Sequence, residues 1–384
     1  MFPVLPRKTD SELDALRTRL LLSVSSLGKE INPIMRSELS EFMLKINSYY
    51  TNAMEGNPSK LKDIENALNQ KFSSNRTTRN FQIEHIAHIE VQKKMYEKLQ
   101  LEPNLEICSQ EFLCWLHEQF YLKLPEALRW AITVSGKRVA ITPGALRERG
   151  ARVGGHDAPE SRKDIELCLQ QFQESLSPVK LKGADQVLAL ASSHHRLLWI
   201  HPFADGNGRV ARLFTLAYAN RIGVDSDHLW NVTRAFARNR SEYDRHLAAA
   251  DLPPRNSYDG RGPLSEEELV HFCKFFLESC LDQIEYMKKI LESSNIKLKL
   301  SRYLRDRMEE GTLNKQPAKA IEYILAMGEL ERGQIREICG VKERRANQIV
   351  KELLGSGIVQ TPSAYGPLRL KLTVELVSTL FPDL

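Results

Sequence analysis

The residues best suited to chemistry lie in one segment, His201-Pro202-Phe203-Ala204-Asp205-Gly206-Asn207-Gly208-Arg209, which Arg212 follows. Gly206 and Gly208 allow a tight turn whose backbone N–H groups converge at the start of a helix, and such a concavity binds anions. Arg209 and Arg212 add two guanidinium groups on the first turn of that helix, which suits a polyphosphate better than a single carboxylate. The segment therefore predicts a site for the phosphates of a nucleotide.

The same segment holds groups that could act on a bound phosphate. Asp205 lies beside the positive turn, where a carboxylate is best explained as a ligand of Mg²⁺. His201 can take up a proton near neutral pH. A glycine turn or a histidine alone would more often be structural, but all these groups within the twelve residues 201–212 indicate function. We infer attack of a hydroxyl on a nucleotide phosphate, with His201 as the base.

The segment His201–Arg212 resembles the signature H-x-F-x-(D/E)-G-N-G-R-x-x-R of Fic-domain proteins at every specified position. Members of that family transfer AMP from ATP to a hydroxyl side chain of a target protein, and the intact G-N-G-R favours AMP over the other groups that relatives transfer. The resemblance implies a general base, a Mg²⁺ ligand, amides that hold the phosphates, and arginines that hold the leaving pyrophosphate. These roles fall in turn on His201, on Asp205, on Gly206, Asn207 and Gly208, and on Arg209 and Arg212.

A second segment, Thr51-Asn52-Ala53-Met54-Glu55-Gly56, resembles the inhibitory motif (S/T)-x-x-x-E-(G/N) of the same family. A carboxylate at the end of a helix faces the negative end of the dipole and is disfavoured by ~0.3 to 1 kcal/mol unless a cation offsets it. The resemblance implies that Arg212 is that cation, so that ATP binds in a pose that is poor for transfer. Thr51 lies one turn earlier and is expected to support Glu55. By itself, an E-G pair would be an ordinary solvated helix end.

Two residues downstream are expected near the adenine of the nucleotide. The stretch from Arg240 to Asp251 resembles the family helix that closes this side of the pocket, which places Tyr243 and Asp251 at the ATP site. Relatives often have asparagine where Asp251 stands. Tyr243 could equally be an aromatic residue of the core.

The spacing of apolar residues predicts that most of the chain is helical. Between Ser11 and Tyr50 we expect two helices, broken near Asn32-Pro33. The second should end at Glu55-Gly56-Asn57-Pro58, because glycine and proline stop helices. The polar stretch Ser59–Arg79 is expected to be a mobile connector. Further helices are predicted over residues 83–99, 161–176, 184–199 and 207–220.

A short β-hairpin is predicted near residues 138–155. Arg138–Thr142 alternates, Pro143-Gly144 is a turn signal, and Ala151–Val153 can return as a strand. In the family this hairpin is a flap that aligns the target segment by strand pairing. The flap residues are expected to be Thr142, Arg152, Val153 and Gly154.

The last ~70 residues have the pattern of a separate small domain. Helices are predicted over 318–327, 332–339 and 343–354, and strands over 358–360 and 368–372, so the segment resembles a winged helix-turn-helix. Residues 312–384 hold ten basic and eight acidic residues, a weaker balance than a dedicated DNA reader has. The candidates for contact with DNA or a partner protein are Arg344, Arg345, Asn347 and Lys351.

Composition limits the class of protein. The chain has 384 residues, 42% hydrophobic and 27% charged, with 54 basic and 49 acidic residues. These values argue against disorder, a membrane protein or a chain coated by nucleic acid. Six scattered cysteines without a C-x-x-C pair indicate a reducing compartment, and no leader or long apolar run is evident, so we expect a cytoplasmic location.

We therefore expect a mainly α protein with an all-helical Fic core, a small β-hairpin flap and a C-terminal winged-helix domain of the α+β type. The expected domains are an N-terminal helical region at 1–80 with the inhibitory helix, a Fic catalytic domain at 81–300 and a winged helix-turn-helix at 312–384.

The expected function is self-inhibited transfer of AMP from ATP, with Mg²⁺, to a Tyr, Ser or Thr hydroxyl of a target protein. Two alternatives stay open: an enzyme that also removes AMP, and an ATP-sensing DNA-binding regulator. The expected partners are the target and, through the C-terminal domain, DNA or a protein, with a homodimer left open and no membrane.

Overall fold

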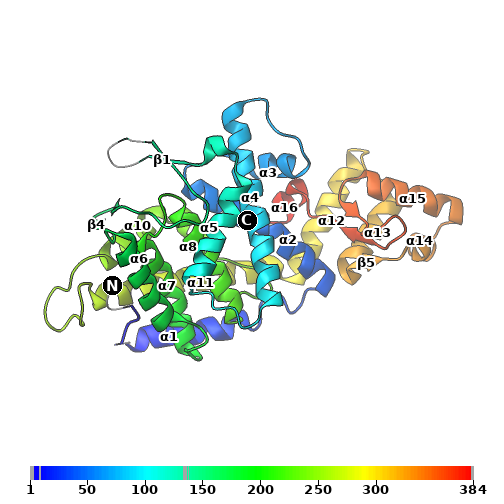
Figure 1. Cartoon of the computed structure of the whole chain (residues 1–384). Coiled ribbons are helices and arrows are strands. Elements are labelled where there is room, and N and C mark those ends of the chain that lie inside the picture. Colours follow the sequence, from blue (N-terminus) through cyan, green and yellow to red (C-terminus); the bar gives the residue numbers. More distant parts are fainter. Residues whose placement is uncertain (1–3, 8–9, 133–135, 137, 382–384) are drawn as a thin grey trace. The chain divides into compact units, whose positions relative to one another are not determined.

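The computed structural model describes residues 4–7, 10–132, 136 and 138–381 (Figure 1). The chain divides into two compact units. Unit 1 comprises Met1–Ser25, Asn47–Ser226 and Trp230–Gln283, and unit 2 comprises Ser26–Ile46, Asp227–Leu229 and Ile284–Leu384. Two helices, α2 (Pro33–Met54) and α11 (Glu266–Leu291), contribute residues to both units.

Unit 1 consists mainly of helices, as the apolar spacing predicts. Besides parts of α2 and α11 it contains α1 (Ser11–Val24), α3 (Leu61–Leu68), α4 (Arg76–Leu101), α5 (Gln110–Lys123), α6 (Arg162–Leu176), α7 (Ala184–Ile200), α8 (Asn207–Arg221), α9 (Thr233–Arg238) and α10 (Arg240–Ala250). Side chains accept hydrogen bonds from the first free N–H groups of several of these helices. The capping residues are Asp10, Asn75, Ser109 and Ser161.

The centre of unit 1 is the pair α7 and α8. Helix α7 contacts α6 and α8, and α8 also contacts α4 and α5. Both helices are buried nearly all round, and Leu197, Leu213 and Phe214 are at most 1% exposed. Because such a core is close-packed, the two helices are rigid, and they hold both ends of the turn that joins α7 to α8.

The expected connector at residues 59–79 is wrong in part, because it contains α3 and the start of α4. Ile64 and Ala67 of α3 are fully buried. These two residues are three positions apart, which is helical spacing, although polar residues surround them in the sequence. Helix α4 begins at Arg76 rather than near Ile83, since Asn75 caps it.

Two short hairpins replace the single one predicted at 138–155. Strand β1 (Trp130–Ile132) pairs antiparallel with β2 (Arg138–Ala140), and β3 (Arg152–Val153) pairs with β4 (His156–Asp157). The predicted pairing of the 138–142 strand with 151–153 is therefore wrong. The strand Trp130–Ile132 lies nearer to β2 in the sequence than residues 151–153 do, so a shorter loop has to be closed to pair with it.

Unit 2 joins a helical part to a small antiparallel sheet. It contains α12 (Ser293–Glu309), α13 (Lys315–Met327), β5 (Glu329–Leu330), a 3₁₀ turn (Arg332–Gln334), α14 (Ile335–Cys339), α15 (Glu343–Gly355), β6 (Val359–Gln360), β7 (Leu368–Leu370) and α16 (Val374–Leu380). The strand order is β5-β7-β6. The three helices and the β6 and β7 strands lie where the sequence predicts them, and β5 is an additional strand.

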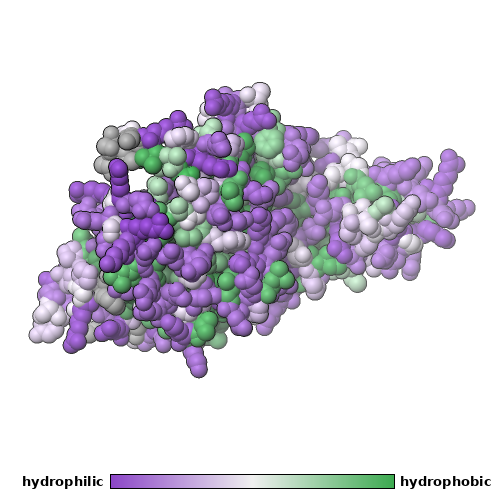
Figure 2. Space-filling view, in the orientation of Figure 1, coloured by the Kyte–Doolittle hydropathy of each residue, from purple (hydrophilic) through white to green (hydrophobic). Residues whose placement is uncertain are grey.

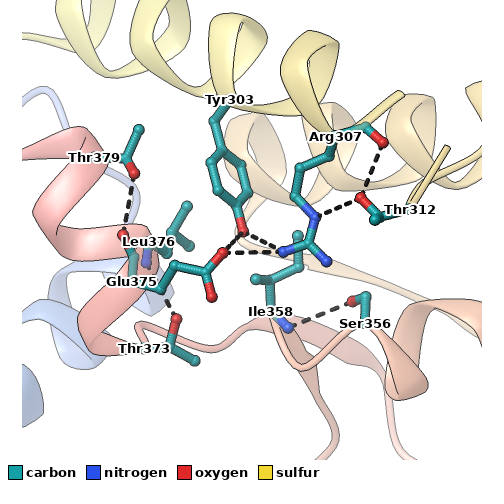
Figure 3. A network of polar contacts seen from close by, with 9 residues as sticks. All are labelled: Tyr303, Arg307, Thr312, Ser356, Ile358, Thr373, Glu375, Leu376 and Thr379. Carbon is teal, nitrogen blue, oxygen red and sulfur yellow. Dashed lines mark hydrogen bonds and ion pairs between the residues drawn. The ribbon is translucent and has the colours of Figure 1, made fainter. Parts of the chain in front are cut away.

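A polar network fixes α16 to α12 within unit 2 (Figure 3). The hydroxyl of Tyr303 and the guanidinium of Arg307 both donate to Oε1 of Glu375, at 3.0 and 3.1 Å. Arg307 also donates to the Tyr303 hydroxyl at 2.9 Å. The three groups therefore satisfy one another's hydrogen bonds.

The surface is mostly hydrophilic, with apolar residues in scattered groups on the face that Figure 2 shows. Within the described ranges, none of the helices is both long and apolar enough to cross a bilayer.

Candidate active site

The turn between α7 and α8 is held by its own side chains. The Oδ1 atom of Asn207 accepts a hydrogen bond from the backbone N–H of Phe203 (2.9 Å), and its Nδ2 donates to the Phe203 carbonyl (2.8 Å). The Phe203 ring is fully buried and stacks on His117 with 4.1 Å between ring centroids. Phe203 therefore anchors the turn, and Asn207 closes it.

His201 ends α7 in a left-handed conformation, with φ 48° and ψ 59°. This conformation costs about 1 to 2 kcal/mol for a residue other than glycine, and Arg147 stabilises it from outside the motif. The Arg147 side chain donates to the carbonyls of His201 (2.7 Å) and Ile200 (3.2 Å), and its N–H donates to the Pro202 carbonyl (3.0 Å). Arg147 thus satisfies helix-end carbonyls and fixes the backbone of His201.

The His201 ring is prepared to accept a proton. Burial, with the nearby charge of Arg147 as a smaller cause, lowers the pKa of His201 to about 4. Its Nδ1 atom is buried without a hydrogen-bond partner among the described residues. At neutral pH the ring is uncharged, which is the form that a general base requires.

Two glycines leave room around the first turn of α8. Gly206 has φ +78°, and a Cβ atom there would lie 2.9 Å from the Tyr121 ring. A Cβ atom on Gly208 would lie 2.6 Å from Oε1 of Glu55 and 3.0 Å from Nη1 of Arg212. The carboxylate of Glu55 therefore lies directly against the N-terminal turn of α8, where an anion is favoured.

Asp205 is oriented by Tyr121, whose hydroxyl donates to Oδ2 at 2.7 Å. This contact leaves Oδ1 as the oxygen that can reach a Mg²⁺ ion. No group of three His, Cys, Asp or Glu side chains suited to a metal occurs among the residues that the structure describes. A single carboxylate fits Mg²⁺ that is bound mainly through nucleotide phosphates and water.

Arg209 lies over the Phe120 ring, with 4.9 Å from its guanidinium carbon to the ring centroid. Although burial lowers the pKa of Arg209, the net shift is upward because the charges of Glu55, Glu84 and Asp205 and the Tyr121 hydroxyl favour the cation. Arg209 therefore remains charged in a partly apolar surrounding, ready to hold an anion.

Arg212 forms the ion pair with Glu55 that the resemblance implies. Its Nη2 donates to Oε1 of Glu55 and, at 3.4 Å, to the carbonyl of Thr51. The Glu55 side chain is 27% exposed. Burial raises the pKa of Glu55, but the charges of Arg212 and Arg209 outweigh it and hold the pKa below its usual value. Thr51 takes part through its backbone rather than its hydroxyl.

A second arginine, which no motif or spacing in the sequence indicates, holds the end of α2. Nη1 of Arg240 donates to the carbonyl of Met54 at 2.7 Å. Arg212 and Arg240 thus place two cations at the negative end of the α2 dipole, which offsets the penalty for Glu55 at that end. Tyr121 and Arg147 were also missed, because an aromatic residue in a helix and an arginine in a loop have no diagnostic spacing.

The two residues expected near adenine have partners within unit 1. Tyr243 is 3% exposed, stacks on Phe236 at 4.4 Å, and shares a hydrogen bond of 2.9 Å between its hydroxyl and Nε2 of His194. These contacts make it an aromatic residue of the core, the alternative that the sequence left open.

Asp251 lies between two histidines. Its carboxylate is 2.9 Å from Nδ1 of His156 on β4 and 3.2 Å from Nε2 of His195 on α7. Burial raises the pKa of Asp251, but these two contacts lower it to about 2. Asp251 therefore joins the β3–β4 hairpin to the helix that carries His201.

The four flap residues do not form one hairpin. Arg152 and Val153 form β3 and Gly154 begins its turn, whereas Thr142 lies after β2 in the other hairpin. In unit 2, Arg344, Asn347 and Lys351 are exposed on α15. Arg345 differs from them, because it pairs with Glu352 at 2.5 Å.

Comparisons with known proteins place the central segment in a family. The Fic/DOC family model matches residues 107–219, which include α5, both His201 and Arg212, and most of α8. Over 108 residues the chain is 32% identical to a protein adenylyltransferase Fic of Drosophila mojavensis, a match that covers 28% of this chain and 21% of the fly protein. The corresponding protein of Drosophila grimshawi is also 32% identical over 108 residues. The match thus spans about a fifth of the length of these curated relatives.

Two solved structures share the fold. A Fic family protein from Desulfovibrio desulfuricans G20 has a TM-score of 0.56 at 16% identity, and the match covers 95% of this chain and 98% of that one. A Fic domain containing signaling protein from Bacteroides thetaiotaomicron VPI-5482 has a TM-score of 0.53 at 17% identity, covering 72% and 97%. Residues 107–219, which carry the His201–Arg212 motif, thus match the Fic/DOC family model, and the fold of the chain is similar to that of Fic family proteins.

Proposed function

We propose that this chain transfers AMP from ATP to a hydroxyl side chain of a target protein, and that Glu55 restrains the transfer. The observation that carries the proposal is the place of the Glu55 carboxylate. It lies against Gly208 at the start of α8 and pairs with Arg212. An anion from the protein thus occupies the groups that would otherwise bind the phosphates of a nucleotide.

In the transfer itself, neutral His201 takes the proton of the acceptor hydroxyl while the hydroxyl oxygen bonds to the α-phosphorus. The bond from that phosphorus to the bridging oxygen breaks, and pyrophosphate leaves. The N–H groups of Gly206, Asn207 and Gly208, together with Arg209 and Arg212, hold the phosphate oxygens as charge moves onto the leaving group. Asp205 would hold Mg²⁺, which supplies positive charge to the phosphates when it is bound.

The restraint acts by competition for one cation. While Arg212 is paired with Glu55, it is not free to bind the γ-phosphate, and the carboxylate repels a phosphate that approaches α8. ATP can then bind only in a pose that misdirects the α-phosphorus from the acceptor. Removal of Glu55 is expected to restore the productive pose.

The test of the chemistry compares two labels on ATP in the Glu55→Gly variant. Label at the α-phosphate should enter protein acceptors of a lysate, label at the γ-phosphate should not, and adding His201→Ala should abolish incorporation. Incorporation of γ-label would identify phosphate transfer instead. Absence of both labels, with ATP binding intact, would overturn the transferase proposal in favour of a nucleotide sensor.

Removal of AMP is a related activity that the same carboxylate could support, because Glu55 near the phosphate groups could orient a water molecule. Wild-type protein and the Glu55→Gly variant are incubated with the AMP-labelled target, without ATP. Faster release by the wild type would favour the bifunctional enzyme, and equal release would exclude it.

Binding of DNA by unit 2 is a second candidate function, favoured by the exposed row Arg344, Asn347 and Lys351 on α15. The double variant Arg344→Ala, Lys351→Ala should weaken binding to DNA. The slope of log affinity against log salt concentration should become less steep by an amount that corresponds to about two phosphate contacts. Arg345 is unsuitable for this test because it is paired with Glu352. Lys319→Ala, exposed on α13, is the matched control. Salt-independent retention, or none in the wild type, would exclude a DNA role.

A further inference from the structure

The helix that ends next to Glu55 is shared by the two units. Helix α2 runs without interruption from Pro33 to Met54. Its residues up to Ile46 group with unit 2, and its residues from Asn47 onward group with unit 1. The residue proposed to restrain the active site is therefore carried by a helix whose first part belongs to the other unit.

The first part of α2 is anchored within unit 2. Asn32 caps the helix through a hydrogen bond from the N–H of Met35 to its Oδ1 (2.8 Å), and its Nδ2 donates to the carbonyl of Leu325 near the end of α13 (3.1 Å). Gln360 of β6 donates to Glu38 at 2.8 Å. Apolar side chains of this part of α2 are also buried, and those at most 3% exposed are Met35, Leu39, Phe42, Met43 and Ile46.

The last part of α2 is held in unit 1 by a series of polar contacts to α4. Asn47 donates to Gln92 at 3.1 Å. Ser48 and Asn52 both contact Nδ1 of His85, at 3.1 and 3.2 Å. Several of these polar atoms, including Oδ1 of Asn47 and of Asn52, are buried without a partner in the described part of the chain.

These polar contacts between the last part of α2 and α4 add little to the stability of the folded protein. The net stabilisation from a buried hydrogen bond is smaller than the cost of leaving a buried acceptor unsatisfied. Separation of the last part of α2 from α4 would expose these groups to water, which satisfies them. The Glu55 end of the helix is therefore the easier of the two ends to release.

Helix geometry connects the two ends. From Glu38 to Met54 the backbone rises about 24 Å along one helix, and a helix transmits rotation and translation along its axis. Hydrogen bonds such as those of Glu55 and Thr51 with Arg212 weaken when their atoms separate by about 1 Å. A small change at the anchor can therefore break the contacts at the other end.

We propose that unit 2 sets the inhibition: it holds α2 so that Glu55 stays on Arg212, and an event on unit 2 that loosens the anchor releases Glu55. This proposal rests on the proposed function for its effect on catalysis, but its structural part stands independently. It makes the C-terminal unit the sensor and α2 the element that carries the signal.

The test loosens the anchor without touching the active site. In the double variant Asn32→Asp, Gln360→Ala, the aspartate can still cap α2 but has lost the donor to Leu325, and Glu38 has lost its partner. The matched control is Glu375→Gln, which disturbs the α12–α16 network of the same unit (Figure 3). Two readouts are taken on the full chain: hydrogen exchange of the amides of residues 51–56, and transfer of α-label from ATP.

In the anchor variant we expect at least about tenfold faster exchange at residues 51–56 and a several-fold rise in transfer, with both unchanged in Glu375→Gln. In the Glu55→Gly background, the anchor substitutions should give no further rise over Glu55→Gly alone. If the anchor variant exchanges amides and transfers AMP at the wild-type rates while Glu55→Gly alone is active, the proposed coupling between unit 2 and Glu55 would be overturned. Faster exchange without transfer by any variant would support the coupling and contradict only the proposed function.

Discussion

His201 combines a strained backbone with a neutral ring. Its left-handed conformation ends α7 and turns the chain toward the glycines, while burial keeps its ring uncharged at pH 7. The backbone conformation depends on Arg147, and the neutral ring depends on burial, with the charge of Arg147 as a smaller cause. Two predictions at the scale of single residues follow from this dependence.

The first concerns pH. Because the pKa of His201 lies at about 4 in the folded protein, the ring is protonated, and useless as a base, only under acidic conditions. Transfer by Glu55→Gly should therefore be constant between about pH 6 and 8 and should fall below about pH 5. Single-turnover rates measure this profile, with circular dichroism to show that the protein stays folded. A midpoint near the usual value for histidine would contradict the account.

The second concerns Arg147. Replacement by alanine leaves the carbonyls of Ile200 and His201 without their donor, in a place where the arginine is only 7% exposed. The free energy of unfolding should drop by about 2 to 4 kcal/mol, as measured by denaturant titration. Arg149→Ala, an exposed neighbour, should stay within about 0.5 kcal/mol of the wild type. Equal effects of the two substitutions would show that Arg147 does not support the turn.

At the scale of elements, the β3–β4 hairpin is attached to the core by a charged contact. His156 stacks on Trp199 and pairs with Asp251. Burial lowers the pKa of His156, but the Asp251 carboxylate outweighs burial, so the pKa is raised. The hairpin is therefore held by an ion pair that depends on the protonation of His156.

A histidine whose pKa is raised by folding stabilises the folded protein at pH values below its pKa in the unfolded chain. This contribution disappears as the pH rises through its pKa in the folded protein. The loss of unfolding free energy caused by Asp251→Asn should accordingly be larger at pH 6 than at pH 9. Denaturant titrations at both values measure the two losses. An equal or larger loss at pH 9 would contradict the pair. Unchanged ATP affinity of the variant would further show that Asp251 does not bind the nucleotide.

Much of the element order could be predicted, and the exceptions have physical causes. The strong apolar period of α7 and α8 and the His201–Arg212 motif between them identified the centre of the fold. Helix α3 was missed because only Ile64 and Ala67 show its buried face among polar residues. The pairing of β2 with β1 was missed because the partner of a strand depends on the length of the connecting loop and on the adjacent strands. The alternation of apolar and polar residues within one strand does not contain this information.

At the scale of the whole molecule, the sequence indicated a linear series of domains, whereas α2 contributes to both compact units. The buried side chains of α2 change from apolar up to Ile46 to polar at Asn47, Ser48 and Asn52, but both sets follow helical spacing, so the spacing does not mark the point where the helix passes from one unit to the other. The pairing of Glu55 with Arg212 came from the resemblance, and the support from Arg240 and Arg147 required the fold. The linear domain boundaries remain a prediction.

The most direct test of the central claim compares transfer of α-label from ATP by the wild type, by Glu55→Gly and by Ala53→Gly. Ala53 is exposed and directly precedes Met54, the last residue of α2, so its replacement places a glycine at the same end of the helix, at a cost of at most about 1 kcal/mol, and keeps the carboxylate. Loss of the Glu55–Arg212 pair should raise transfer about tenfold or more, and Ala53→Gly should stay near the wild-type rate. Equal transfer by all three proteins would contradict restraint by Glu55.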